Sequence, residues 1–590
     1  MQVARRIYLY VVAFISLQML LAGARSLLGL LAELAIGTSR DLVDQDRYYR
    51  DRASLWGAVL LVGALVWAAH WLLIRRSVSG EGEEGEERQS IWRKLFLYAT
   101  LFVAAWQVFF ALANLIEGVL ANLAEVGGAR LGGTVADSLP AILVYGLAWF
   151  YHWTVRRADL ARGPEIGAGA VVARWYRFLA SYGAFSVLIW ALSTLARQLW
   201  RAVTLPGGAD LLGDGVTGPI AGALGFAAAG LVVWLPHWAL AQGQLAEDDA
   251  ERHSVLRKVY LYALIGQLVG VTLTNLALFG YTGLRTLIGT DPLTGSGDTL
   301  LTAGGLPLLT ALVYGVAWAY HRRVLGDDAR LLVAEEGRQA TIRRIYTYLL
   351  ALIGLVLLAA GIADLLRLLI DAALGGRATT ELGARAWGDQ ISLFATGIVV
   401  GGLVWVAHWL AAQRAALAAG GVAERRALVR RIYLFLDLFA GVVALLVSGA
   451  ILVYRLLRSL GIGLSGDDRS DLSWALGVAI TAGGVVAYHL RVLLDDQRQR
   501  AGEPAERAAV VVAAPSAARL ILIGGGAPEG IDAAIAELRA ALPASATCDT
   551  FAAEGIAAAE VRAWLAARAR TRPVEEPTGA PGGAPTPATL

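Results

Sequence analysis

The first apolar segment of this sequence opens with RRIYLY, residues 5–10, and the second closes with VWAAHW, residues 66–71. Both patterns return five times. The opening recurs as RKLFLY (93–98), ARWYRF (173–178), RKVYLY (257–262), RRIYTY (343–348) and RRIYLF (430–435), and the histidine of VWAAHW, His70, recurs as His152, His237, His321, His408 and His489. We call the residues at the fourth and sixth positions of each opening its first and second aromatic residues. In every copy, 56 to 62 residues separate this first aromatic residue from the histidine. Such a fixed period indicates an internal repeat.

Each copy contains two apolar segments joined by a polar loop, such as residues 7–35 and 53–74 in the first. Because roughly 20 apolar residues cross a bilayer core as a helix, each copy is predicted to be a transmembrane helical hairpin. The sequence therefore predicts an all-α polytopic membrane protein with twelve transmembrane helices. The six hairpins are placed at residues 1–80, 88–162, 168–246, 252–328, 338–416 and 424–495.

The endings of the copies alternate. Copies one, three and five end in AHW, PHW and AHW, whereas copies two, four and six end in YHW, YHR and YHL. The larger repeat is therefore predicted to be a block of four helices that is present three times.

Composition supports a membrane location. The 590 residues are 57% hydrophobic and only 17% charged, with a mean hydropathy of +0.57, which is too apolar for a soluble enzyme of this size. The net charge of +3 gives no reason to expect a nucleic-acid partner. A single cysteine, Cys548, excludes an intrachain disulfide or a cysteine-cluster metal site. The preference for Arg over Lys suggests a bacterial genome, so we expect the bacterial inner membrane, with the lipid bilayer as main partner.

Basic residues indicate the orientation. They are more frequent at the N-terminus and between hairpins than in the loops inside hairpins, so both termini and the inter-hairpin segments are predicted to be cytoplasmic. The acidic run EGEEGEE, residues 81–87, is interpreted as a solvated linker on that side.

The chain changes character after the last hairpin. Residues 496–517 are interpreted as a charged linker, residues 518–572 as a small soluble α/β domain with two strands and two helices, and residues 573–590 as a disordered tail rich in Pro and Gly. We expect a cytoplasmic protein partner for the α/β domain.

The six repeated histidines are the candidate site residues. Trp at three residues before five of them favours anchoring at the membrane interface, or a contact between hairpins at the helix ends. A haem held by two histidines such as His70 and His152 is an alternative, as is metal binding or proton transfer. We predict neither a cofactor nor a metal. The RRIYLY copies are interpreted as anchors to lipid headgroups.

Deep ionisable residues are few, and Asp437 lies only four residues into its segment. This argues against an ion-coupled pump. We therefore predict a non-enzymatic membrane scaffold or sensor with no catalytic residue. The alternatives are a transporter or channel for a small solute, and a haem-binding redox protein that uses paired histidines.

The combination of (R/K)(R/K)xYxY with a later WxxH in a two-helix unit resembles a bacterial family of multi-pass membrane proteins that is known only as a domain of unknown function. The resemblance covers residues 3–495 in six imperfect copies. The third copy displaces Arg174 and Arg177, and Val486 replaces the tryptophan of the sixth. The resemblance implies a fold and no activity.

Overall fold

The computed structural model of the protein confirms the prediction of twelve long apolar helices. Twelve described helices are long and apolar enough to cross a membrane. They form six consecutive pairs: α1 (Gln2–Ile36) and α2 (Gln45–Val78), α4 (Ile91–Leu123) and α5 (Leu131–Leu160), α6 (Gly167–Thr204) and α7 (Asp214–Glu247), α9 (Val255–Ile288) and α10 (Leu300–Arg330), α11 (Gly337–Leu374) and α13 (Ala384–Leu417), α15 (Leu428–Ile462) and α16 (Gly466–Ala513). The structure describes residues 2–37, 45–78, 84–124, 131–204, 214–247, 249–288, 300–331, 337–376, 384–418 and 421–513.

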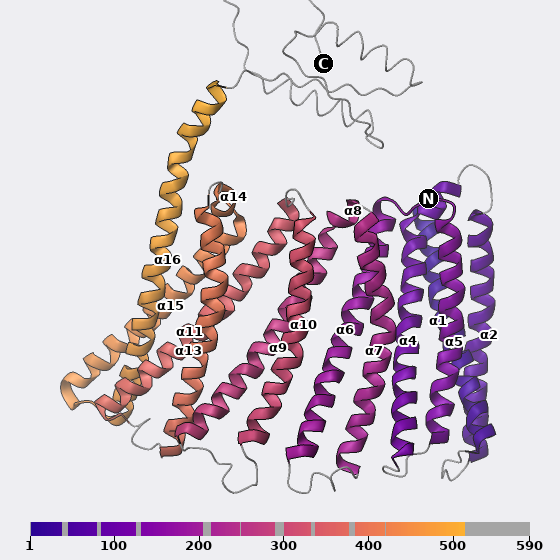
Figure 1. The fold of residues 1–590 in the computed structure, drawn as a ribbon, viewed down its shortest axis with the longest axis horizontal. Coiled ribbons are helices and arrows are strands. Elements are labelled where there is room, and N and C mark those ends of the chain that lie inside the picture. The colour runs from indigo at the N-terminus through magenta and orange to yellow at the C-terminus, as the bar shows by residue number, and fades with distance from the viewer. Residues whose placement is uncertain are drawn as a thin grey trace, which may run out of the picture. The chain divides into compact units, whose positions relative to one another are not determined.

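Short helices join the first hairpin of each block to the second. They are α3 (Glu84–Gln89), α8 (Asp249–Arg252) and α14 (Val422–Arg425). Figure 1 shows the N-terminus, α8 and α14 at one end of the helices. The RRIYLY copies begin the first helix of each hairpin, and the histidines lie near the end of the second, so both motifs meet there. We call this the motif end.

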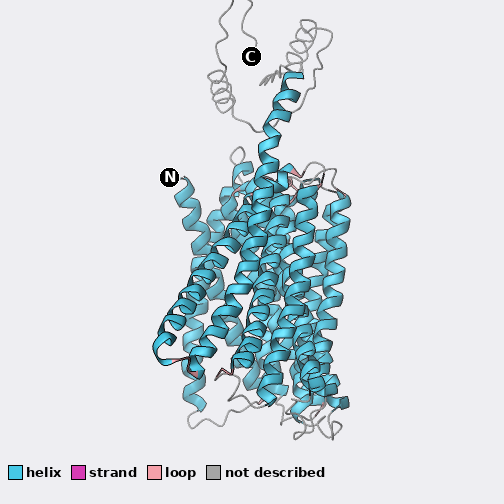
Figure 2. Ribbon diagram, turned by 90° about the vertical axis from the view of Figure 1, so that its left-hand side faces the viewer, coloured by secondary structure: helices cyan, strands magenta, loops and turns pink. Residues whose placement is uncertain are grey.

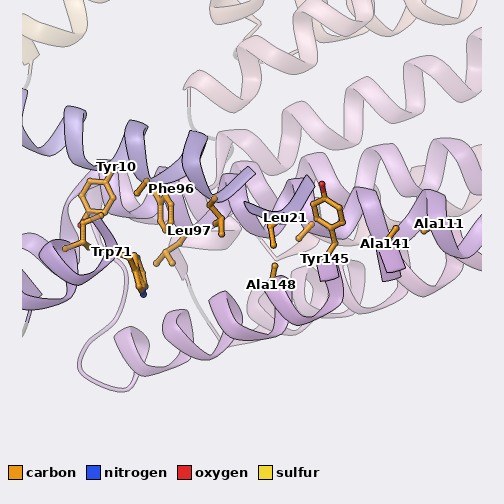
Figure 3. Close-up of a cluster of buried hydrophobic side chains, with 13 residues drawn as sticks. Tyr10, Leu21, Trp71, Phe96, Leu97, Ala111, Ala141, Tyr145 and Ala148 are labelled. Carbon is orange, nitrogen blue, oxygen red and sulfur yellow. The ribbon is translucent and has the colours of Figure 1, made fainter. Parts of the chain in front are cut away.

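Three separate cores divide the helices into blocks. The first draws its buried side chains from α1, α2, α4 and α5, the second from α6, α7, α9 and α10, and the third from α11, α13, α15 and α16. We number these blocks 1 to 3. Figure 3 shows the core of block 1, where Tyr10, Trp71 and Phe96 lie together and the smaller Ala141 and Ala148 come from α5. The side view in Figure 2 shows that the described elements are helical.

Close packing depends on small residues at helix contacts. Two glycines lie at such contacts: a Cβ on Gly225 of α7 would collide with the Ala113 carbonyl of α4, and one on Gly401 of α13 would collide with the backbone of Leu358 in α11. Glycine permits such an approach because no side chain separates the two backbones. The Gly225 contact joins block 1 to block 2, whereas the Gly401 contact lies inside block 3.

Helix α16 continues through Ala513 and so covers much of the predicted charged linker at 496–517. Ala, Arg and Glu, which favour helix, are frequent in this stretch. Asp496, the first residue of the predicted linker, is buried and bonded to Arg430. The predicted α/β domain at 518–572 and the predicted tail at 573–590 lie outside the described residues, and the described ones contain no strand.

Candidate functional site

All six histidines of the motif end are held by the same backbone contact. Nδ1 of each ring lies 2.7–2.9 Å from the carbonyl oxygen four residues earlier. A carbonyl oxygen only accepts, so Nδ1 donates its hydrogen. Nε2 is therefore the ring atom that can meet other groups.

The histidines differ in what faces Nε2. In the first hairpin of a block it meets the first aromatic residue of the same hairpin: the Tyr8 hydroxyl is 3.3 Å from His70, and the Tyr176 hydroxyl is 2.9 Å from His237. The rings of Tyr346 and His408 are 5.8 Å apart in the corresponding place. The histidines of the second hairpins, at positions 152, 321 and 489, are buried inside the cores. Interfacial anchoring does not describe these three, whereas a helix-end contact does.

A tryptophan–tyrosine hydrogen bond joins the two hairpins of every block. The indole nitrogen donates to the tyrosine hydroxyl at 2.7, 2.7 and 2.6 Å in the pairs Trp71–Tyr151, Trp238–Tyr320 and Trp409–Tyr488. These residues follow the first histidine of a block and precede the second. The alternating HW and YH endings in the sequence supply the donor and the acceptor of this hydrogen bond.

The two aromatic residues of each RRIYLY copy contact different neighbours. The second aromatic of one hairpin packs on the first aromatic of the next, and we call the resulting five pairs the aromatic ladder. The ring centroids are 5.9, 5.2, 5.2, 5.0 and 5.4 Å apart in Tyr10–Phe96, Tyr98–Tyr176, Phe178–Tyr260, Tyr262–Tyr346 and Tyr348–Tyr433. The motif therefore connects hairpins in sequence order.

The arginines of the second hairpins are buried in ion pairs. Arg93, Arg257 and Arg430 each hold one aspartate through two hydrogen bonds of 2.7–3.1 Å, to Asp159, Asp328 and Asp496 respectively. We call these three pairs the arginine clamps. The interpretation of RRIYLY as an anchor to headgroups is wrong for these arginines. A signal for the clamps was present, because each aspartate stands seven residues after its histidine.

The short connecting helices are tied to the first hairpins by one glutamate each. Glu87 of α3 accepts hydrogen bonds from Arg6 and Tyr10 at 2.7 and 2.8 Å. Glu251 of α8 and Glu424 of α14 contact the corresponding arginines of blocks 2 and 3 in the same way. The interpretation of EGEEGEE as a solvated linker therefore fails at Glu87. The shared signal is the dipeptide Glu-Arg in each connection.

The haem hypothesis requires two facing histidines. The His70 ring packs against Tyr8, whereas the His152 ring packs against Trp71, Phe96 and Tyr151. These contacts place aromatic rings around His152 in the core. Among the described residues no group of three or more His, Cys, Asp or Glu side chains could hold a metal ion.

A family model for a domain of unknown function, DUF5671, matches the chain three times, at residues 6–147, 174–320 and 344–484. The chain belongs to the DUF5671 family. Each match begins in the first helix of a block and ends in its fourth, so one DUF5671 repeat corresponds to one block. No curated protein and no solved structure matches.

The third DUF5671 repeat differs from the others beside its buried histidine. Asp437, four residues after the first aromatic of the hairpin, is buried, and its Oδ2 lies 3.4 Å from Nε2 of His489. Thr100 and Leu264 occupy this position in the first and second repeats. The Tyr433 hydroxyl is also 3.4 Å from Nε2. The separation of Nε2 and Oδ2 exceeds the length of a strong hydrogen bond, and Oδ2 has no hydrogen-bond partner among the described residues, so the carboxylate keeps acceptor capacity.

A cavity of about 270 Å³ adjoins this carboxylate in the third DUF5671 repeat. Helices α11, α15 and α16 form it, and its lining is Leu, Val, Ala and Gly apart from Asp437 and Thr481. The volume is near the lower end for small-molecule sites, roughly 300 Å³. An apolar space with one buried carboxylate suits a small apolar molecule that carries a single hydrogen-bond-donating group. The position of Asp437 near the start of its apolar segment predicts a place near the membrane interface, but the sequence does not predict this cavity.

A second cavity, of about 340 Å³, lies in the first DUF5671 repeat between α1, α2 and α5. Its lining includes Arg25, Glu33, Arg52 and Asp137. Basic and acidic groups are mixed there, so their charges compensate one another. The cavity offers no single ligand chemistry.

Proposed function

We propose that this DUF5671 protein is a non-enzymatic membrane sensor that binds a small apolar amine in block 3. The first two blocks serve as the scaffold. The observation that carries the proposal is the buried carboxylate of Asp437 at the edge of an apolar cavity. Ionisable groups inside membrane segments are expensive and are the usual mark of a binding or transport site.

The chemistry at Asp437 favours an amine. Nδ1 of His489 donates to the Val485 carbonyl, so Nε2 of the neutral ring carries no hydrogen. Nε2 and the carboxylate are then both acceptors, and a hydrogen bond between them requires an additional proton. An ammonium group supplies three donors and a positive charge, and it could satisfy the carboxylate from the cavity side. The apolar walls would then cover the hydrocarbon part of the molecule.

Thermal unfolding of the full chain in lipid nanodiscs tests this proposal, with tryptophan fluorescence as the readout. Hexylamine should raise the melting temperature, because a ligand at 100 times its dissociation constant stabilises by about 2.7 kcal/mol. Hexanol should have a smaller effect. Asp437→Asn should remove the hexylamine effect, whereas Ser448→Ala, which changes a buried hydroxyl of the same helix outside the cavity, should keep it. An equal response of the wild type and Asp437→Asn would exclude this site.

A transporter is the second candidate, because a buried carboxylate in a membrane helix also serves coupled transport. Uptake of hexylamine into proteoliposomes separates the two functions. Uptake that requires Asp437 would favour transport, whereas binding without uptake favours a sensor.

We also infer that the motif end is cytoplasmic and that the protein lies in the cell membrane. The basic residues of the N-terminus and the inter-hairpin segments support this orientation. In a Cys548→Ser background, Gly82→Cys should resist a membrane-impermeant thiol reagent in intact cells, whereas Ser39→Cys, between α1 and α2, should react. The reverse pattern would invert the topology. Residues 518–572 remain candidates for contact with a cytoplasmic protein.

A further inference from the structure

The blocks join one another twice through corresponding surfaces. Helix α4 of block 1 packs on α6 and α7 of block 2, and α9 of block 2 packs on α11 and α13 of block 3. In both places one pair of the aromatic ladder crosses the junction. The pair is Tyr98–Tyr176 at the first junction and Tyr262–Tyr346 at the second. The surface on α4 and α9 is the forward face, and the surface on the following hairpin is the receiving face.

Block 3 carries a forward face that no described residue covers. Phe435 corresponds to Tyr98 and is 54% exposed, whereas Tyr98 is 3% exposed. One face of α15 continues this pattern, since Leu446 is 68% exposed but its counterpart Phe109 in α4 is 1% exposed. The aromatic or aliphatic surface is present in both cases, although Tyr98 also has a hydroxyl that bonds to Glu165 and Arg156 and that Phe435 lacks.

Block 1 carries a receiving face that the described part of the chain likewise leaves uncovered. Tyr8 is 58% exposed, whereas its counterpart Tyr176 is 7% exposed. The sequence VGALVW, residues 62–67 of α2, matches VGGLVW, residues 400–405 of α13. Val404 of α13 is buried with Ile265 and Val269 at the second junction. The corresponding surface of α2 thus has nearly the composition of one that already receives a forward face.

We propose that two copies of this chain associate head to tail in the membrane, with α15 of one copy on α1 and α2 of the next. Phe435 would then pack against Tyr8 and extend the aromatic ladder from chain to chain. Lipid can cover any apolar helix face, but the two internal junctions show that the corresponding surfaces of other hairpins pack on each other. Such a contact is heterologous, so it can add further copies or close into a ring.

The contact between chains is weaker than the internal junctions. At the first junction Lys94 is buried and bonded to Glu165, which lies in the connection between the two blocks. Arg431 occupies the corresponding position in block 3 and is exposed. Separate chains lack a covalent connection that brings a carboxylate to this place. The association should therefore depend on the density of the protein in the membrane.

Cross-linking in native membranes tests the proposal. Two differently tagged full-length copies, both Cys548→Ser, carry Tyr8→Cys and Phe435→Cys respectively and are treated with a short bismaleimide. We expect a cross-linked product that contains both tags, at least several-fold above a control in which Trp175→Cys replaces Tyr8→Cys. Trp175 is also exposed and precedes the counterpart of Tyr8, so it reports random collision. Both target side chains are exposed, and gel filtration verifies that each variant is folded.

Three outcomes would overturn the proposal. Products formed by the Phe435→Cys copy alone would indicate a two-fold symmetric contact instead. Equal yields with Tyr8→Cys and Trp175→Cys would mean that only collision occurs. The absence of any product at high expression would mean that lipid covers both faces.

Discussion

Block 3 and block 2 share the contacts between their hairpins but differ beside the buried histidine. Both contain a buried histidine, a tryptophan–tyrosine bond and an arginine clamp. Block 2 has Leu264 where block 3 has Asp437. Leu264 belongs to the packed core of its block, whereas Asp437 lines a cavity. Other cavity-lining positions also differ, since Leu355 and Gly441 stand where block 2 has the core residues Phe185 and Leu268. A repeat can therefore preserve the contacts between its hairpins while a few smaller or polar side chains near its histidine open a site.

All three blocks contain an arginine clamp, and loss of a clamp should cause the largest decrease in the free energy of unfolding. Arg257→Ala leaves Asp328 as a buried charge without its partner, which costs about 3–5 kcal/mol of unfolding free energy. Arg93→Ala and Arg430→Ala should lose a similar amount. Denaturant unfolding in detergent, followed by tryptophan fluorescence, measures the change.

Two variants control this experiment. Arg330→Ala removes a mostly exposed pair with Asp327 and should change stability by less than about 0.5 kcal/mol. The double variant Arg257→Met with Asp328→Leu removes both charges and should recover most of the loss. A clamp variant as stable as Arg330→Ala would show that the blocks are held together by other contacts.

Placing the residue of one block in the other, at positions 264 and 437, should change the stability less than loss of a clamp does. The two changes should have opposite signs. Leu264→Asp buries a carboxylate in a packed core and should destabilise by at least about 2 kcal/mol. Asp437→Leu removes a buried charge and should be neutral or stabilising by about 1 kcal/mol. Thermal melting of both variants in nanodiscs checks the signs. Destabilisation by Asp437→Leu would mean that Asp437 is structural, and it would weaken the proposed binding site.

The smallest effects should come from single hydroxyl groups. Tyr320→Phe leaves the buried indole N–H of Trp238 without its acceptor and should cost about 1–2 kcal/mol. Tyr8→Phe loses only a 3.3 Å contact at an exposed ring and should change stability by less than about 0.5 kcal/mol. The difference in melting temperature between the two variants compares a contact inside a block with a contact on the uncovered receiving face of block 1. Equal values would refute this ranking.

The sequence contained enough information for the helices and the repeat. Twelve apolar segments with fixed motif spacing left few alternatives, because a membrane span needs a minimum apolar length. The environment of the arginines was not predicted correctly. Arg93 at a helix start is typical of a residue near headgroups, and only the folded hairpin brings Asp159, 66 residues later, against it.

The candidate site was harder to predict for a different reason. Asp437 stood out as a charge within an apolar segment, but its cavity depends on side chains of α11 and α16 that are distant in the sequence. Periodicity reports which face of a helix is apolar. It does not report where three apolar faces leave space between them.

The arginine clamps also bear on how the chain enters the membrane during synthesis. Each clamp closes over 66 to 71 residues, inside a single hairpin. The arginine emerges from the ribosome first and its aspartate follows after two spans. A hairpin can thus use its basic residue to orient its insertion and then neutralise that charge, before any later hairpin has been translated. Charge compensation at the clamps therefore requires only the completed hairpin.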